Sequence, residues 1–176
     1  MLGRYAWGRL LLAVVLSAFV AIVLRPLMAY AVDGRAHELI ISMNYPHAMQ
    51  LFERAQRMDP NLSDAVTMQL WLARLAPAAD ARAAIARSHA YLDRHPDSLA
   101  LEYRAFAWQH LGDNAAAAME FAQAAAAAPT DWKMNEMAAQ SARKIGSDAN
   151  ARRYFLRVVQ LKPGWPPAVR ALRELE

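Results

Sequence analysis

Cysteine is absent from the 176-residue sequence, and glycine occurs only six times. The missing cysteine excludes a disulfide framework and a thiolate metal site. Alternating runs of Val, Ile and Thr, which favour β-strands, are rare after residue 42. Residues that lose little entropy on entering a helix dominate instead, chiefly Ala, Leu, Met, Arg, Gln and Glu. The composition therefore predicts an all-α protein, and its 56% hydrophobic content argues against a disordered chain.

Recognisable catalytic motifs are missing as well. The sequence contains no serine nucleophile elbow, no phosphate-binding glycine loop and no dinucleotide fingerprint. His89 and His95 are six residues apart and would point to different faces of a helix, and His37 lacks the second histidine of a zinc-protease motif. We expect solvated surface histidines at all five positions, His37, His47, His89, His95 and His110. The sequence thus predicts no enzyme activity, no cofactor, no metal ligand and no small-molecule substrate.

The formal net charge of +4 is concentrated at the N-terminus. From residue 33 onward the chain carries 17 basic and 16 acidic side chains, so the charge does not indicate a nucleic-acid partner. Residues 93–142 carry 3 basic and 7 acidic groups, whereas residues 143–176 carry 8 and 3. This asymmetry either steers a charged partner or reflects ordinary solvated helix faces.

An uncharged apolar run occupies residues 10–24. At about 1.5 Å per residue, its fifteen residues fall short of the roughly 30 Å hydrocarbon core of a membrane. Trp7 at one interface and residues 27–32 at the other would complete a span if Arg25 snorkels, with a kink at Pro26. This interpretation makes the N-terminal segment a transmembrane anchor, in contact with the membrane through residues 7–32.

The same N-terminal segment, residues 1–32, also fits a secretory signal peptide. Its small-x-small site would allow cleavage after Ala31 and release a chain that starts at Val32. Against cleavage, Arg25 separates the apolar run from this site. Both interpretations stay open, and in both the remainder of the chain lies outside the cytoplasm.

The orientation follows from flanking charges. Arg4, Arg9 and the amino terminus outweigh Arg25 and Arg35, so the positive-inside rule places the N-terminus in the cytoplasm. We therefore expect a single-pass protein of a bacterial-type inner (cytoplasmic) membrane with a periplasmic domain. Small residues recur every fourth position at Ala13, Ser17 and Ala21, a stripe on which another transmembrane helix can pack closely.

Proline marks the chain at regular intervals. Pro60, Pro96, Pro129 and Pro163 are separated by 36, 33 and 34 residues. Before three of them, a small residue, an aromatic and a second small or apolar residue recur 12, 8 and 5 positions upstream. The three sets are Ala48, Phe52 and Ala55 with Pro60; Ala117, Phe121 and Ala124 with Pro129; and Ala151, Phe155 and Val158 with Pro163. Such a period indicates a repeat architecture.

This frame resembles that of the tetratricopeptide repeat (TPR) family, in which small residues let two helices approach and a proline ends the second helix. Gly112 and Gly146 fit the turn between the helices, where a left-handed backbone favours glycine. Met43, followed by Asn44, takes that place in the first repeat. The resemblance implies about four helical hairpins, stacked as a short right-handed α-solenoid behind one transmembrane helix.

The expected array covers residues 33–163, followed by a capping helix at 164–176. Its four units are approximately 33–60, 61–96, 97–129 and 130–163. The second unit departs from the family pattern because Ser88 replaces the aromatic, and Arg35 and Arg104 stand where the family prefers a large apolar residue.

The resemblance also implies a ligand groove lined by the first helix of each hairpin. Its expected residues are Asp33, His37, Ile40, Glu102, Phe106, Gln109, Glu136, Gln140 and Arg143. Asp33, Glu102 and Glu136 stand at positions where some members of the family carry a basic clamp for a C-terminal carboxylate, so this clamp is not expected here. An acidic groove with Phe106 suits a basic or apolar segment. Trp165 lies outside the regular pattern and is expected as an exposed contact, whereas Trp71, Trp108 and Trp132 are expected between helices.

Three functions remain open. The first is a non-catalytic, membrane-tethered scaffold or assembly factor that binds other proteins through the groove. The second is an accessory structural subunit of a larger membrane complex, held by its transmembrane helix. The third is a soluble periplasmic TPR binding protein released by cleavage near Ala31.

Overall fold

The computed structural model describes residues 2–175. The side chain of Arg4, one of the charges behind the expected orientation, lies outside the described residues. Within the described part of the chain all regular structure is helical, which confirms the all-α prediction. The chain forms two compact units, Met1–Met68 and Gln69–Glu176, which are described separately. The junction between the units, after Met68, lies inside helix α4 (Ser63–Ala73) and does not coincide with an expected repeat boundary. The expected repeat boundaries stay predictions.

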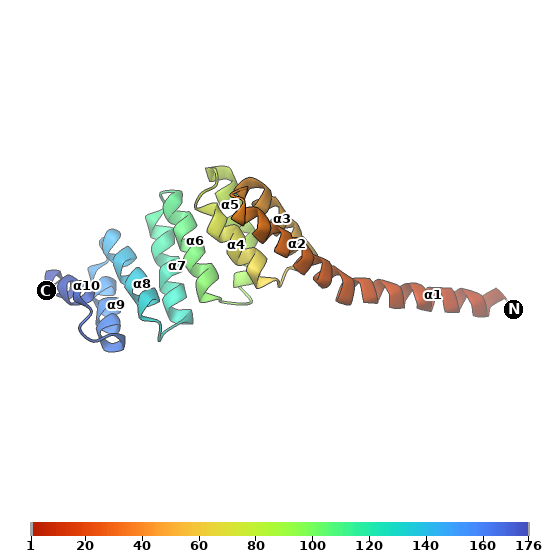
Figure 1. Cartoon of the computed structure of the whole chain (residues 1–176). Helices are drawn as coiled ribbons and strands as arrows, with labels where there is room; N and C mark the ends of the chain where they lie inside the picture. Colours follow the sequence, from red (N-terminus) through yellow and green to blue (C-terminus); the bar gives the residue numbers. More distant parts are fainter. Residues whose placement is uncertain (1, 176) are drawn as a thin grey trace. The chain divides into compact units, whose positions relative to one another are not determined.

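The first unit begins with a long helical segment. Helix α1 (Leu2–Phe19), the π-helical turn η1 (Val20–Leu24) and α2 (Arg25–Ile41) follow one another without a break in helical backbone (Figure 1). The π turn lies just ahead of Pro26, the residue expected to kink the helix. Because a proline ring clashes with the carbonyl four residues before it, one wider turn relieves the strain at this point.

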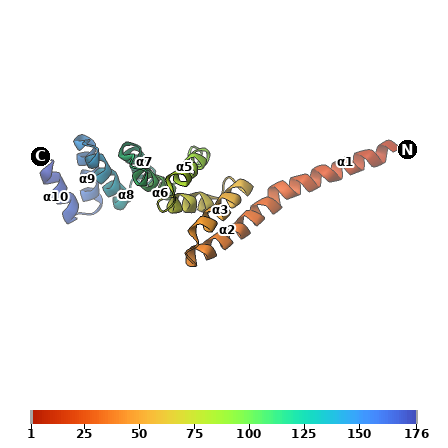
Figure 2. The same cartoon turned by 90° about the horizontal axis from the view of Figure 1, so that it is seen from above.

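Helix α3 (Tyr45–Met58) packs antiparallel to α2, and the two lie side by side in Figures 1 and 2. Ala29, Asp33 and Ala36 form the buried face of α2. The buried face of α3 consists of Ala48, Met49, Phe52 and Ala55. The alanines on both faces are fully buried, so the two backbones approach closely and the Phe52 ring fills the remaining space. The first fully buried residue of α2 is Ala29, and the described side chains of α1 and η1 are exposed.

The turn between α2 and α3 is made without glycine. Met43 has a φ of 59°, while Gly112 and Gly146 have φ values of 82° and 73° at the corresponding places. At this turn the Asn44 amide donates to the Leu39 carbonyl over 2.8 Å and closes the end of α2. The Asp113 amide makes the equivalent bond to the Trp108 carbonyl, over 3.0 Å, after Gly112. The expectation that Met43 replaces the turn glycine is confirmed.

Helix α4 (Ser63–Ala73) spans the junction of the units, and the second unit continues with six helices among its described residues. These are α5 (Ala78–Leu92), α6 (Ser98–His110), α7 (Asn114–Ala127), α8 (Trp132–Lys144), α9 (Asp148–Leu161) and α10 (Pro166–Glu174). From α6 onward each helix packs on the next, and Figure 1 shows α6 with α7 and α8 with α9 as adjacent hairpins. The arrangement is that of stacked helical hairpins.

Aspartates fix the starts of three helices. The side chains of Asp97, Asp113 and Asp131 accept hydrogen bonds from backbone amides in the first turns of α6, α7 and α8. Each cap satisfies an amide that has no partner inside the helix and places a negative charge at the positive end of the helix dipole. Two of the capped helices, α6 and α8, begin hairpins, and α8 carries part of the candidate site of the second unit.

The repeated frame residues lie in the cores of both units. Ala48, Phe52, Ala55, Ala117, Phe121, Ala124, Ala151, Phe155 and Val158 are all at most 3% exposed. The prolines Pro60, Pro129 and Pro163 that follow each set are exposed. Ser88 is buried where the frame would have an aromatic, and its hydroxyl donates to the Ile85 carbonyl over 2.7 Å. The buried hydroxyl therefore has a hydrogen-bond partner within its own helix, which explains how serine is tolerated at this position.

Candidate functional site

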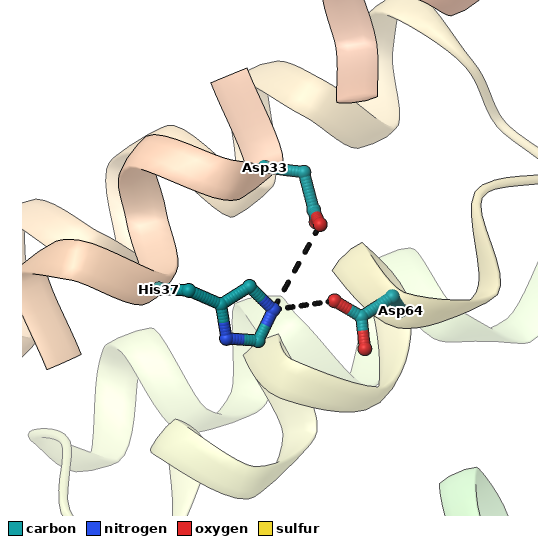
Figure 3. Close-up of side chains that lie close together, drawn as sticks. All are labelled: Asp33, His37 and Asp64. Carbon is teal, nitrogen blue, oxygen red and sulfur yellow. Dashed lines mark hydrogen bonds and ion pairs between the residues drawn. The ribbon is translucent and has the colours of Figure 1, made fainter. Parts of the chain in front are cut away.

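Two residues of the expected groove, Asp33 and His37, lie one turn apart on α2 in the first unit. Asp64, in the first turn of α4, comes within reach of both (Figure 3). The His37 Nε2 atom lies 2.6 Å from Asp64 Oδ2 and 3.8 Å from Asp33 Oδ2. One ligand atom from each residue lies within 4.8 Å of the others. We call these three residues the α2–α4 cluster.

The members of the α2–α4 cluster differ in burial. Asp33 is only 7% exposed, whereas the side chains of His37 and Asp64 are 42% and 48% exposed. Burial, reinforced by the nearby Asp64 carboxyl and opposed by His37, raises the pKa of Asp33 to about 6. The His37 ring is held edge-on against Phe52 at 5.1 Å between centroids. The cluster therefore pairs a buried carboxyl with two groups that face solvent.

His37 was expected to be a solvated surface histidine, and the structure gives it two carboxylate neighbours instead. Asp64 was not among the expected site residues because it lies 27 positions after His37. The spacing of Asp33 and His37 by four residues on one helix was the available signal. Ile40, the third groove residue expected on this helix, is half-buried.

In the second unit, the acidic and aromatic groove residues are largely covered. Glu102 is 9% exposed. Its burial, and next the negative charge of Asp131, raise the pKa of Glu102, while the positive charges of Arg74 and Lys133 partly offset this rise. Phe106 is half-buried, with its ring edge-on to Phe121 at 5.2 Å. Arg74 lies over the rings of Trp71, Tyr103 and Phe106. Trp108 and Gln109 are both half-buried. These side chains offer little open acidic surface to a ligand.

Trp165 is not freely exposed, which corrects that part of the expectation. Its indole Nε1 donates to Glu136 over 2.9 Å, and its ring lies 5.1 Å from that of Trp132. The Lys162 ammonium lies 3.6 Å and 3.8 Å from the centres of the two rings. These contacts join α8 to the start of α10 and occupy Glu136 within the chain.

An open hollow lies between α8, α9 and α10, with a volume of about 550 Å³. Two expected groove residues, Gln140 and Arg143, line it together with Lys144, Phe155, Pro167, Arg170, Ala171 and Glu174. Arg143 Nη1 lies 2.8 Å from Glu174 Oε2, and both side chains are about half exposed. Three cations face one carboxylate here. We call this surface the basic hollow, and its charge is opposite to that expected for the groove.

Lys144 and Arg170 were not expected in the site. The charge count of residues 143–176 contained the signal, since this segment carries an excess of five basic groups. Lys144 follows Arg143 on α8, and the packing of α10 beside α8 and α9 brings Arg170 into the same hollow.

The apolar N-terminal helix is the remaining candidate surface. The segment Arg9–Ile41 is long and apolar enough to cross a membrane, and its most apolar window is unburied, features that a signal sequence shares. Ala13, Ser17 and Ala21 are exposed, and Ser17 and Ala21 line a shallow depression of about 400 Å³ with Leu16, Val20 and Arg25. Arg25 Nη2 donates to the Arg57 carbonyl over 3.2 Å, so this side chain reaches the end of α3.

Comparison with known proteins finds no matching family model and no matching curated protein. Among solved structures, MamA is similar with a TM-score of 0.67 at 12% identity, over 84% of this chain and 80% of that chain. A tetratricopeptide repeat protein from Parabacteroides merdae has a TM-score of 0.67 at 14% identity, over 84% of this chain and 59% of that chain. PilF from Pseudomonas aeruginosa has a TM-score of 0.62 at 15% identity, over 86% of this chain and 68% of that chain. The chain has the fold of tetratricopeptide repeat proteins.

Proposed function

We propose that this chain is a non-catalytic, membrane-tethered scaffold that binds an acidic segment of a partner protein in the basic hollow. The observation that carries the proposal is the grouping of Arg143, Lys144 and Arg170 around an open surface. The exposed cations of Lys144 and Arg170 and the paired guanidinium of Arg143 attract carboxylates over roughly one Debye length, about 8–10 Å at physiological salt. A carboxylate of an extended acidic segment would replace Glu174 as the ion-pair partner of Arg143.

Retention of the N-terminal segment as an anchor is supported by the way α2 packs. Ala29 is fully buried in the α2–α3 pair, two residues before the possible cleavage point at Ala31. Cleavage there would remove the first seven residues of α2 and the Arg25 contact with the end of α3. A chain that starts at Val32 would thus lose part of its first hairpin, which favours an uncleaved protein.

The span we propose, shorter than the expected contact over residues 7–32, runs from Trp7 to Leu24, with the Arg9 side chain snorkelling to the cytoplasmic surface. Its eighteen residues would extend about 27 Å as a helix, close to the hydrocarbon thickness of a membrane. Arg25 then lies at the membrane surface beside the end of α3, and the exposed Leu27, Met28 and Tyr30 fit the interface. Under the positive-inside rule the repeat domain lies in a periplasm-type compartment.

Site-specific photo-crosslinking tests the proposed binding surface. A photoreactive residue at Gln140 in the basic hollow should form adducts with partner proteins in cells, and the crosslinked partner peptides should be rich in Asp and Glu. The matched control is the exposed Gln123 on α7, which lies outside the hollow. Equal adducts at both positions, or partner peptides without acidic character, would contradict the proposal.

A second candidate function is an accessory subunit held in a membrane complex by its transmembrane helix. The exposed stripe of Ala13, Ser17 and Ala21 favours it, because small side chains let another helix approach. Replacing Ser17 by Leu should then release the chain from a complex of fixed stoichiometry in mild detergent. Release by Arg170→Glu instead would favour the scaffold.

A further inference from the structure

The α2–α4 cluster brings together two carboxylates and an imidazole from distant parts of the sequence. Asp33 and His37 share one face of α2 because they are four residues apart, and Asp64 approaches from the first turn of α4. In Figure 3 the Asp33 carboxyl and the His37 Nε2 atom point toward each other, with the Asp64 carboxyl beside them. The three ligand atoms lie within 4.8 Å of one another.

A second observation comes from Asp33 itself. Its Oδ1 atom is buried and has no hydrogen-bond partner, although the residue is only 7% exposed. A buried carboxylate oxygen without a partner costs free energy, because the water it would bind is lost without replacement. The neighbouring Asp64 carboxylate adds repulsion when both groups are ionised. A cation held between the two carboxylates would remove the repulsion, and bidentate binding by the Asp33 carboxyl would also give Oδ1 a partner.

From this geometry we propose that the α2–α4 cluster is a binding site for a divalent transition-metal ion of the zinc class. One nitrogen and two carboxylate oxygens form a donor set that Zn²⁺ and Co²⁺ accept, whereas Ca²⁺ needs six to eight oxygens. The half-exposed side of His37 and Asp64 leaves room for water as a further ligand. The ion would tie α2 to the first turn of α4.

The observed distances fit this donor set after a small adjustment. Ligand atoms around a tetrahedral zinc ion lie about 3.3 Å apart, given metal–ligand distances of about 2.0–2.1 Å. The separations of 3.8 Å between His37 and Asp33 and 2.6 Å between His37 and Asp64 bracket that value. Opening the shorter contact by less than an ångström requires movement of only half-exposed side chains. The His37 ring packs at right angles to the buried Phe52 ring, 5.1 Å between centroids, on the side away from solvent.

The test uses the full chain without an affinity tag, in detergent micelles. Titration with Co²⁺, followed by its absorption spectrum, should saturate at one ion per chain, and Zn²⁺ should displace the signal. His37→Gln and Asp64→Asn should each weaken binding by about tenfold or more, since each removes a direct ligand. Asp33→Asn should do the same, and circular dichroism checks that each variant keeps its helices.

The control variant is His47→Gln, which removes an exposed histidine of the same unit outside the cluster. It should bind Co²⁺ as the unaltered chain does. Bound Zn²⁺ should also raise the melting temperature of the unaltered chain and of His47→Gln, but not that of Asp64→Asn. Absence of saturable binding overturns the proposal, as does equal loss of binding in His47→Gln and Asp64→Asn. If Asp33→Asn fails to fold, His37→Gln and Asp64→Asn decide the outcome.

Discussion

Arg104 on α6 and Glu120 on α7 form a buried ion pair, with Nη2 and Oε2 2.8 Å apart and side chains that are 6% and 10% exposed. Arg104 stands where the TPR pattern prefers a large apolar residue, and the pair explains how a charge is tolerated there. A second contact, 3.4 Å from Nη1 to His89 Nδ1, extends the network to α5. The position is thus filled by a bonded polar group rather than by an aliphatic side chain.

Removing one member of this pair should be more harmful than removing both. Glu120→Ala leaves the Arg104 charge buried and unpaired, so we expect a loss of about 3–5 kcal/mol in the free energy of unfolding. The double variant Arg104→Met with Glu120→Leu should recover most of that loss, because apolar groups of similar size carry no desolvation cost. Urea unfolding followed by circular dichroism measures both. A double variant less stable than Glu120→Ala would contradict this account.

The left-handed turn at Met43 should be improved by glycine. A non-glycine residue in this conformation costs roughly 1–2 kcal/mol, while glycine loses about 0.5–1 kcal/mol more backbone entropy on folding. Met43 is 75% exposed, so its side chain contributes little packing. We expect Met43→Gly to raise the melting temperature and the matched change Gly112→Ala to lower it. A lower melting temperature for Met43→Gly would show that the Met43 side chain stabilises the turn.

Stability should depend on pH through Glu102. Burial, then Asp131, raises its pKa, so the folded state holds this proton more tightly than the unfolded chain. Its stabilising contribution is fully present below the unfolded pKa, about 4.3, and is lost as pH rises through the folded pKa. Glu102→Gln should therefore gain stability over the unaltered chain at pH 7 and lose that advantage near pH 4. Melting curves at both pH values test this, with the exposed Glu38→Gln as the surface-charge control.

The absence of native cysteine makes the proposed topology directly testable. A Ser63→Cys variant places one thiol at an exposed position in the repeat domain. In cells with a permeabilised outer membrane, a membrane-impermeant maleimide should label it without lysis. Intact mass from the same membranes should show a chain that still contains Met1. Labelling only after lysis would reverse the orientation, and a mass starting at Val32 would remove the anchor.

The sequence was sufficient to predict the elements that depend on local spacing. The buried frame around Phe52, Phe121 and Phe155 follows from a fixed period along each helix, and the turn at Met43 from its place in that period. Contacts between distant elements were not predictable in this way. Asp64 meets His37 only because the first turn of α4 comes near α2, and nothing in the local pattern marks the pair.

The same limit explains the groove. Its residues were assigned from helix positions alone, which do not reveal that Glu102 is buried or that Trp165 binds Glu136. The basic hollow depends on α10, whose packing beside α8 adds Arg170 to the charges of that helix. Repeat positions alone therefore do not show which groove side chains are covered by neighbouring helices, and the groove itself stays a prediction.

The central claim, that the basic hollow binds acidic segments, is tested most directly by the affinity of the full chain in detergent micelles for a fluorescent decaglutamate peptide. We predict that Arg170→Glu weakens binding roughly threefold to tenfold, that Glu174→Gln strengthens it, and that raised salt weakens it. The control Arg152→Glu makes the same charge change on the exposed surface of α9, outside the hollow, and should have a smaller effect. Equal weakening by Arg152→Glu and Arg170→Glu would contradict the account, because only the net charge would then matter.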